Sequence, residues 1–225
     1  MEYTVESILT YLKGAGNEKM KKHHLKAGAG DYLFGVQMGD IRKLANKIKV
    51  NHKLAMDLWK SENTDARFLA VLLMESVKLS ITDLYVLTTS EKYTYVIDWL
   101  TSYVIKVHPD MENIRQAWLL DNHIMVKRVA WSLTSHQVNH HPDLLNIPSV
   151  LNEIESKMAI SAPEIQWTMN ATLAQIGIRL PAYTEAAISI GEKIGLYKDF
   201  PVSKGCTSPY APVWIEALLA KNRPH

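Results

Sequence analysis

Two segments of the chain repeat one helix–turn–helix pattern. The first reads LAMDLWKSENTDARFLAVLL and the second IRQAWLLDNHIMVKRVAWSL, and their tryptophans, Trp59 and Trp118, are 59 residues apart. In each segment a helix ends near the tryptophan, an acidic residue followed by asparagine forms the turn, and a second helix rich in aliphatic residues follows. One such hairpin cannot bury its apolar face alone, so neighbouring hairpins must stack side by side. The chain is therefore predicted to be all-α, a solenoid of antiparallel helical repeats.

The other segments also show the 3.6-residue periodicity of amphipathic helices. Asn17 and Asn51 are placed to cap helices over residues 18–26 and 52–60, and Thr64 is placed to cap a helix over 65–78. Further helices are predicted over 4–13, 40–49, 82–87, 92–105, 110–119, 123–137 and 213–221. We predict a single helical-repeat domain over residues 1–225, with an irregular segment at 198–213 leading into the final helix.

Composition limits the compartment and the class of protein. Cys206 is the only cysteine, so no disulfide can form within the chain, which favours a reducing cytoplasm. No apolar run approaches the roughly 20 residues that a membrane-spanning helix needs. The amphipathic N-terminal segment carries two glutamates and is not typical of a signal peptide. These features predict a cytoplasmic protein without a membrane partner, and we expect a monomer.

Charge is unevenly distributed although the formal net charge is only +2. Residues 1–60 hold eleven Lys and Arg against six Asp and Glu, which is compatible with phosphate contacts. Arg42, Lys43 and Lys47 lie away from the apolar side of the 40–49 helix. The histidine pairs at 23–24 and 140–141 bring no nearby cysteine and no second ligand four residues further on, so neither a metal site nor a cofactor is predicted.

Asp98 has unusual neighbours in the 92–105 helix. At 100° per residue, Val96, Ile97 and Leu100 fall on one apolar side and Asp98 on the other. Thr94, Tyr95, Thr101, Ser102 and Ile105 fall within about 60° of Asp98. An ordinary surface helix would place Lys and Glu on such an outer face. Asp98 is either a solvated surface residue or a carboxylate that faces a cleft.

Four stretches resemble the AlkD family of DNA alkylation repair proteins. They are FGVQMGDIRKLA at 34–45, LWKSENTDARFLAVLL at 58–73, VID at 96–98 and the DN–KRVA run at 121–130. The similarity extends over roughly residues 31–180. It implies a right-handed solenoid of HEAT-like repeats whose basic concave face cradles duplex DNA. It also implies a glycosylase activity that cleaves the N-glycosidic bond of N3- and N7-alkylated purines without flipping the base into a pocket.

The resemblance also implies roles for individual residues. Asp98 matches the family's catalytic aspartate, and Arg128 matches an arginine that lines the same cleft. By helical arithmetic Arg128 lies off the core side of its helix and shares a face with Trp131. The residues predicted to contact DNA are Arg128, Arg42, Lys43, Lys47, Thr94, Tyr95 and Trp131.

The chain departs from the family at the residues around the lesion. Thr94 and Ala171 stand where two tryptophans belong, and Ala174 replaces an arginine. Three functions therefore stay open. The first is an alkylpurine DNA glycosylase that uses Asp98. The second is the same solenoid binding duplex or distorted DNA without base excision. The third is a protein-interaction solenoid with no role on DNA.

Overall fold

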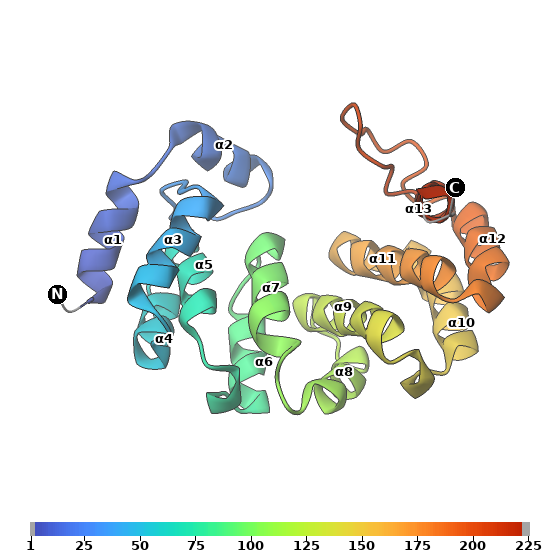
Figure 1. Cartoon of the computed structure of the whole chain (residues 1–225), viewed down its shortest axis with the longest axis horizontal. Helices are drawn as coiled ribbons and strands as arrows, with labels where there is room; N and C mark the ends of the chain where they lie inside the picture. The colour runs from blue at the N-terminus through green and yellow to red at the C-terminus, as the bar shows by residue number, and fades with distance from the viewer. Residues whose placement is uncertain (1–2, 222–225) are drawn as a thin grey trace. The chain divides into compact units, whose positions relative to one another are not determined.

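A computed structural model describes residues 3–221, which are helical with no β-strand (Figure 1). The first helices are α1 (Val5–Gly14), α2 (Glu18–Lys26), α3 (Met38–Ile48), α4 (His52–Lys60), α5 (Thr64–Leu73), α6 (Ile81–Thr89) and α7 (Thr94–Leu100), and α7 continues as the π-helix η2 (Thr101–Ile105). The remaining α-helices are α8 (Met111–Leu119), α9 (Ile124–His140), α10 (Ile147–Lys157), α11 (Pro163–Arg179), α12 (Thr184–Ile194) and α13 (Ala211–Lys221). Short 3-10 turns lie at Ser76–Lys78, Pro142–Leu144, Met158–Ile160 and Pro181–Tyr183.

The chain groups into two compact units, which divide between Met111 and Glu112. The single domain over residues 1–225 stays a prediction. The irregular segment before the last helix is present, because residues 195–210 form only turns and extended backbone. The last helix begins at Ala211, two residues earlier than the sequence predicts.

Side-chain caps start several helices of the first unit. The amide oxygens of Asn17 and Asn51 accept backbone N–H groups of α2 and α4, which confirms both predicted caps. The cap of α5 is Asn63 and not Thr64, since the Asn63 side chain accepts from the Ala66 N–H at 3.0 Å. α5 ends at Leu73, earlier than predicted, and a 3-10 turn follows.

Helix α5 is the centre of the first unit and packs against α3, α4 and α7. Nearly all of its residues are buried, including Asp65. The Asp65 carboxylate accepts the backbone N–H groups of Phe34 at 2.6 Å, Gly35 at 3.2 Å and Val36 at 2.8 Å. These three bonds tie the loop that precedes α3 to the start of α5. The buried carboxylate thereby fixes where α3 begins.

The helix that carries Asp98 changes its geometry after Leu100. Over η2 the Lys106 N–H bonds to the Thr101 carbonyl, the i→i+5 pattern of a π turn. The wider turn shifts the phase of every later residue. Ile105, predicted beside Asp98, is buried instead, because the α-helical arithmetic assumed one period throughout. Thr101, also predicted beside Asp98, lies at the start of the π turn and is buried too.

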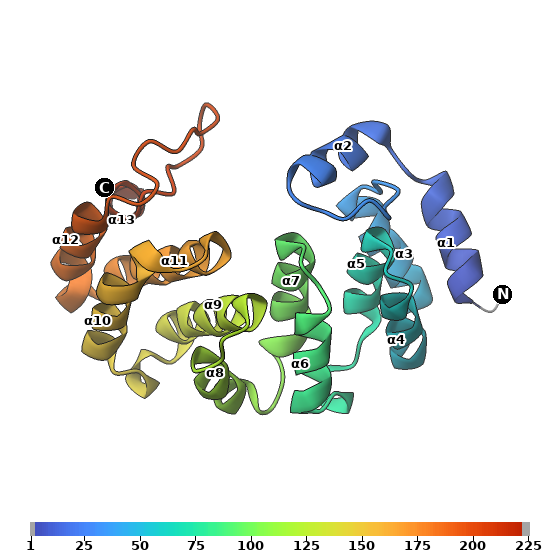
Figure 2. The same ribbon diagram turned by 180° about the vertical axis from the view of Figure 1, so that it is seen from behind.

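In the second unit α9 and α11 form the main helix pair. They lie side by side in both views (Figures 1 and 2), and α12 and α13 pack on α11. Glycine is required at one crossing, since a Cβ on Gly177 of α11 would meet Ile215 of α13 at 2.5 Å. The core of this unit is formed mainly by α9, α10 and α11 with α12 and α13.

Candidate nucleic-acid interface

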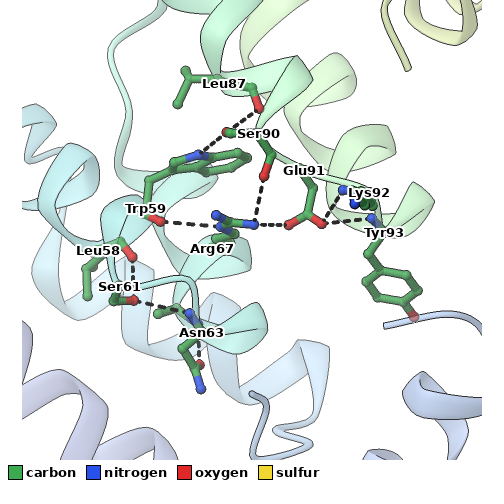
Figure 3. A network of polar contacts seen from close by, with 11 residues as sticks. Leu58, Trp59, Ser61, Asn63, Arg67, Leu87, Ser90, Glu91, Lys92 and Tyr93 are labelled. Carbon is green, nitrogen blue, oxygen red and sulfur yellow. Dashed lines mark hydrogen bonds and ion pairs between the residues drawn. The ribbon is translucent and has the colours of Figure 1, made fainter. Parts of the chain in front are cut away.

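A buried ion pair sets the start of α7. One Glu91 carboxylate oxygen accepts the backbone N–H groups of Lys92 and Tyr93, each at 2.7 Å. The other oxygen accepts from the Arg67 guanidinium at 2.8 Å (Figure 3). The two side chains are only 11% and 8% exposed. Glu91 therefore orients the first residues of the helix that presents Asp98, and Arg67 of α5 neutralises Glu91.

Arg67 is itself held by the first tryptophan turn. Its Nε donates to the Trp59 carbonyl at 3.3 Å, and its guanidinium lies 5.1 Å from the centre of the Trp59 ring (Figure 3). The Trp59 indole N–H donates to the Ser90 hydroxyl at 3.0 Å. The repeated tryptophan of the sequence thus has a structural role. It links the turn after α4 to the turn before α7.

Asp98 is half-buried and lines a pocket of about 330 Å³ in the first unit. The other lining residues are Met20, His23, His24, Met38, Phe68, Tyr95 and Trp99. Asp98 also acts electrostatically on Lys106. Burial lowers the pKa of the Lys106 ammonium, and the Asp98 carboxylate raises it. The pocket therefore combines one carboxylate with aromatic and thioether walls, and the cleft-facing alternative fits this placement of Asp98.

His24 adds a buried polar group to the same pocket. It is 4% exposed, and its Nδ1 lies 2.8 Å from the Tyr93 hydroxyl. Burial is the main cause that lowers the pKa of His24, so the imidazole is neutral at pH 7. Burial also raises the pKa of the Tyr93 phenol, which keeps its proton and can donate it to Nδ1. Among the described residues, His24 Nε2 has no hydrogen-bond partner.

Aromatic side chains recur every four residues along α7 and η2. Tyr95 and Tyr103 are each 43% exposed, and Trp99 between them is half-buried. The Trp99 and Tyr103 ring centres are 5.4 Å apart. The Arg42 guanidinium lies 4.5 Å from the centre of the Trp99 ring, and its Nη2 donates to the Tyr103 hydroxyl at 3.3 Å. We call Tyr95, Trp99 and Tyr103 the aromatic row.

The predicted basic residues lie on the exposed side of α3. Arg42, Lys43 and Lys47 are all exposed, and Lys43 forms a solvated ion pair with Asp40 at 3.0 Å. A second pocket, of about 540 Å³, lies between α3 and η2. Its lining is Arg42, Ala45, Asn46, Lys49, Val50, Leu72 and Tyr103. The structure thus brings Arg42 to the aromatic row.

Thr94 is the first residue of α7 and is half-buried, one turn before Asp98. Tyr95 follows it and contributes to the Asp98 pocket. Tyr95 also stacks on Tyr93, with ring centres 5.1 Å apart and planes inclined by 29°. Of the two residues beside Asp98 that were predicted to contact DNA, Tyr95 therefore provides the aromatic surface.

Arg128 lies in the second unit and is more deeply buried than the helical arithmetic predicts. It is 4% exposed, and its Nη1 donates to the backbone carbonyl of Glu164 at 2.8 Å. Its charge also acts on Tyr197, whose pKa is raised by burial and lowered by Arg128. The physical reason for the burial is that α11 packs along α9.

Trp131 does not fit the predicted contact with DNA. Its side chain is 2% exposed and belongs to the core of the second unit. Its backbone carbonyl accepts from the Thr172 hydroxyl of α11 at 3.0 Å. The helix face that carries Trp131 looked free in the sequence because the sequence does not reveal that α11 covers it.

An aromatic cluster in the second unit has no signal in the sequence. Trp167 of α11 is 40% exposed, and its ring centre lies 5.5 Å from that of Tyr197 and 6.2 Å from that of Phe200. Tyr197 and Phe200 belong to the irregular segment after α12, where no periodicity orients side chains. Trp167 stands one helical turn before Ala171, and only the folded segment identifies its neighbours.

Metal ligands and membrane-spanning helices also bear on the class of site. The described residues 3–221 hold no group of three or more His, Cys, Asp or Glu side chains arranged for a metal ion. In the same part of the chain, no helix has the length and apolar character needed to cross a bilayer.

The fold and this site define a HEAT-like helical-repeat protein. A solved structure is similar to this chain, with a TM-score of 0.83 and 20% sequence identity. The aligned region covers 98% of this chain and 96% of the solved chain. The solved structure is described as one of a family of proteins related to the HEAT-like repeat DNA glycosylases with affinity for branched DNA structures. This likeness confirms the predicted all-α fold of HEAT-like repeats.

The chain belongs to the family of DNA alkylation repair enzymes, whose model matches residues 8–207. Among curated proteins, an uncharacterized protein of Listeria innocua is 24% identical, with 98% of each chain covered. An uncharacterized protein of Listeria monocytogenes is 23% identical over the same shares.

Proposed function

We propose that this protein binds DNA through the surface of its first unit formed by α3, α7 and η2, and that Asp98 is its reactive group. One observation carries the proposal. The Asp98 carboxylate lines a pocket walled by Tyr95 and Trp99, and the Arg42 guanidinium stacks on the same Trp99 ring. A fixed carboxylate, aromatic rings and a cation at one surface suit a charged sugar–base unit beside a phosphate.

Phosphate contact is supported by the charges on α3. Arg42, Lys43, Lys47 and Lys49 are exposed on this helix and its C-terminal cap. An arginine already oriented by an aromatic ring loses less freedom when it binds a phosphate. The affinity of the solved neighbour for branched DNA supports the same partner class for this chain.

Excision of N3- or N7-alkylpurines is the reaction that this carboxylate supports best. The C1′–N bond of an alkylated nucleotide breaks with both electrons moving to the cationic base, which leaves neutral. The positive charge passes to the sugar, where the Asp98 carboxylate stabilises it. A water then adds to C1′ and releases one proton, which leaves an abasic site. Tyr95 and Trp99 take the role of the tryptophan that the family has at the position of Thr94, because their ring faces attract the cationic base.

DNA binding is tested by the salt dependence of affinity for an undamaged duplex. If the α3 surface neutralises three or four phosphates, the log–log slope against salt is expected to be roughly −3 to −4. Fluorescence anisotropy at several salt concentrations measures it. A slope near zero would mean that no phosphates are neutralised, and would favour the protein-interaction alternative instead.

A further inference from the structure

We propose that the aromatic row of Tyr95, Trp99 and Tyr103 is a stacking surface for unpaired bases, so that the preferred substrate is DNA with unpaired nucleotides at a fork or branch. The inference rests on the proposed DNA-binding function and specifies its substrate.

Exposure separates these rings from ordinary core aromatics. Tyr95 and Tyr103 are each 43% exposed, whereas Tyr93, two residues before Tyr95, is 2% exposed. Tyr11, another exposed tyrosine of the first unit, lies on α1, which carries no such row. Exposed aromatic area is costly in water. A row of partly exposed rings on one helix side is therefore best explained by a ligand that covers it.

The row is held in place before any ligand arrives. Trp99 packs edge-on against Phe68, with ring centres 5.0 Å apart. Tyr103 lies against Trp99 and accepts a hydrogen bond from Arg42. The π turn that carries Tyr103 is tied to the chain before α6, because the Ser76 hydroxyl donates to the Val104 carbonyl at 2.8 Å. Rings fixed in this way lose little entropy when a base stacks on them.

Two pockets flank the row and provide the space that bases need. The Asp98 pocket, of about 330 Å³, includes Tyr95 and Trp99, and the pocket of about 540 Å³ includes Tyr103 and Arg42. Both volumes lie within the roughly 300–1,000 Å³ of sites that take small ligands. Arg42 belongs to the second pocket and also stacks on Trp99. A cation beside stacked rings is the arrangement expected where a single strand passes with its phosphates and bases side by side.

A fully paired duplex cannot stack its bases on the aromatic row. Its base faces are covered by neighbouring base pairs, so aromatic rings can stack only on a base that has left the helix or was never paired. Lysines and arginines alone would bind duplex DNA without the row. The aromatic row is therefore the element that discriminates between paired and unpaired DNA.

The test compares a forked DNA, with 2-aminopurine as the first unpaired nucleotide, with a fully paired duplex of equal length. We expect the wild-type protein to bind the fork about tenfold more tightly, in keeping with one or two stacked bases. We also expect the 2-aminopurine fluorescence to be quenched on binding. The double variant Tyr95→Leu/Tyr103→Leu should lose the quenching and bring the ratio of fork affinity to duplex affinity down to about one. Tyr11→Leu, at a comparably exposed tyrosine on α1, is the matched control and should behave as wild type.

Each outcome of this test supports or overturns the stacking proposal. Equal wild-type affinity for fork and duplex, with salt-dependent binding of both, overturns the stacking proposal and leaves the DNA-binding proposal intact. A fork preference that persists in a double variant with unchanged thermal unfolding also overturns it. A protein that binds neither DNA removes the DNA-binding proposal and this one with it.

Discussion

Replacing Arg67 with methionine is expected to lower the free energy of unfolding by about 3–5 kcal/mol, because it leaves the Glu91 carboxylate buried without its cation. The pair is joined at 2.8 Å with both side chains about nine-tenths buried. Urea unfolding of wild type and variant measures the difference. Loss of the pair also frees the start of α7, so the variant should lose DNA affinity even below the unfolding range.

Two controls isolate the buried charge as the cause. Lys43→Met removes a cation from a solvated pair, with side chains 75% and 40% exposed, and should cost no more than about 1 kcal/mol. Adding Glu91→Leu to Arg67→Met removes the uncompensated charge and should restore part of the stability. A loss of less than about 1 kcal/mol in Arg67→Met would show that Glu91 finds another partner and that the ion pair does not determine the placement of α7.

The second large effect concerns Asp98 itself. Asp98→Asn keeps the size of the side chain and removes its negative charge, so the sugar cation that forms as the base leaves is no longer stabilised. We expect the release of 7-methylguanine from duplex DNA to fall by about 10²–10³-fold, in the range found when one electrostatic stabiliser of a transition state is removed. Abasic sites are scored by strand cleavage under single-turnover conditions.

Affinity for DNA distinguishes a chemical role from a structural one. Asp98→Asn should bind the same duplex at least as well as wild type, because a negative charge facing phosphates is removed. Asp57→Asn, at an aspartate of α4 that is half-buried like Asp98, is the matched control and should retain full activity. If wild type and Asp98→Asn both release the base only at background rate, the protein excises no alkylpurine and its function is DNA binding alone.

The local signals of the sequence predict the helices well, because they act within a few residues. Asn17 and Asn51 cap the helices that their positions indicate. The sequence predicts Thr64 as the cap of α5, one residue after the observed cap, Asn63. Asparagine and threonine are both good N-caps, so the two adjacent positions compete for this role.

Positions that depend on tertiary contacts could not be predicted from the sequence. The π turn in η2 moves Ile105 into the core and leaves Tyr103 exposed, and no residue pattern indicates it. Arg128 and Trp131 lie on α9, which is covered on more than one side. A helix face that is polar in the sequence can therefore be buried in the fold. For Asp98 the sequence shows an off-core carboxylate, and the structure adds the aromatic pocket around it.

Matched pairs of lysine substitutions test most directly whether DNA lies on the α3 side of the first unit. Lys43→Gln/Lys47→Gln removes two charges from α3, and Lys53→Gln/Lys60→Gln removes two from α4. In each pair one lysine is ion-paired with an aspartate three residues earlier, at 3.0 Å for Lys43 and 3.5 Å for Lys60. We expect the α3 pair to make the salt slope of duplex binding less steep by about 2 and the α4 pair to leave it unchanged. An unchanged slope for the α3 pair, or an equal change for both pairs, would contradict this placement of the DNA.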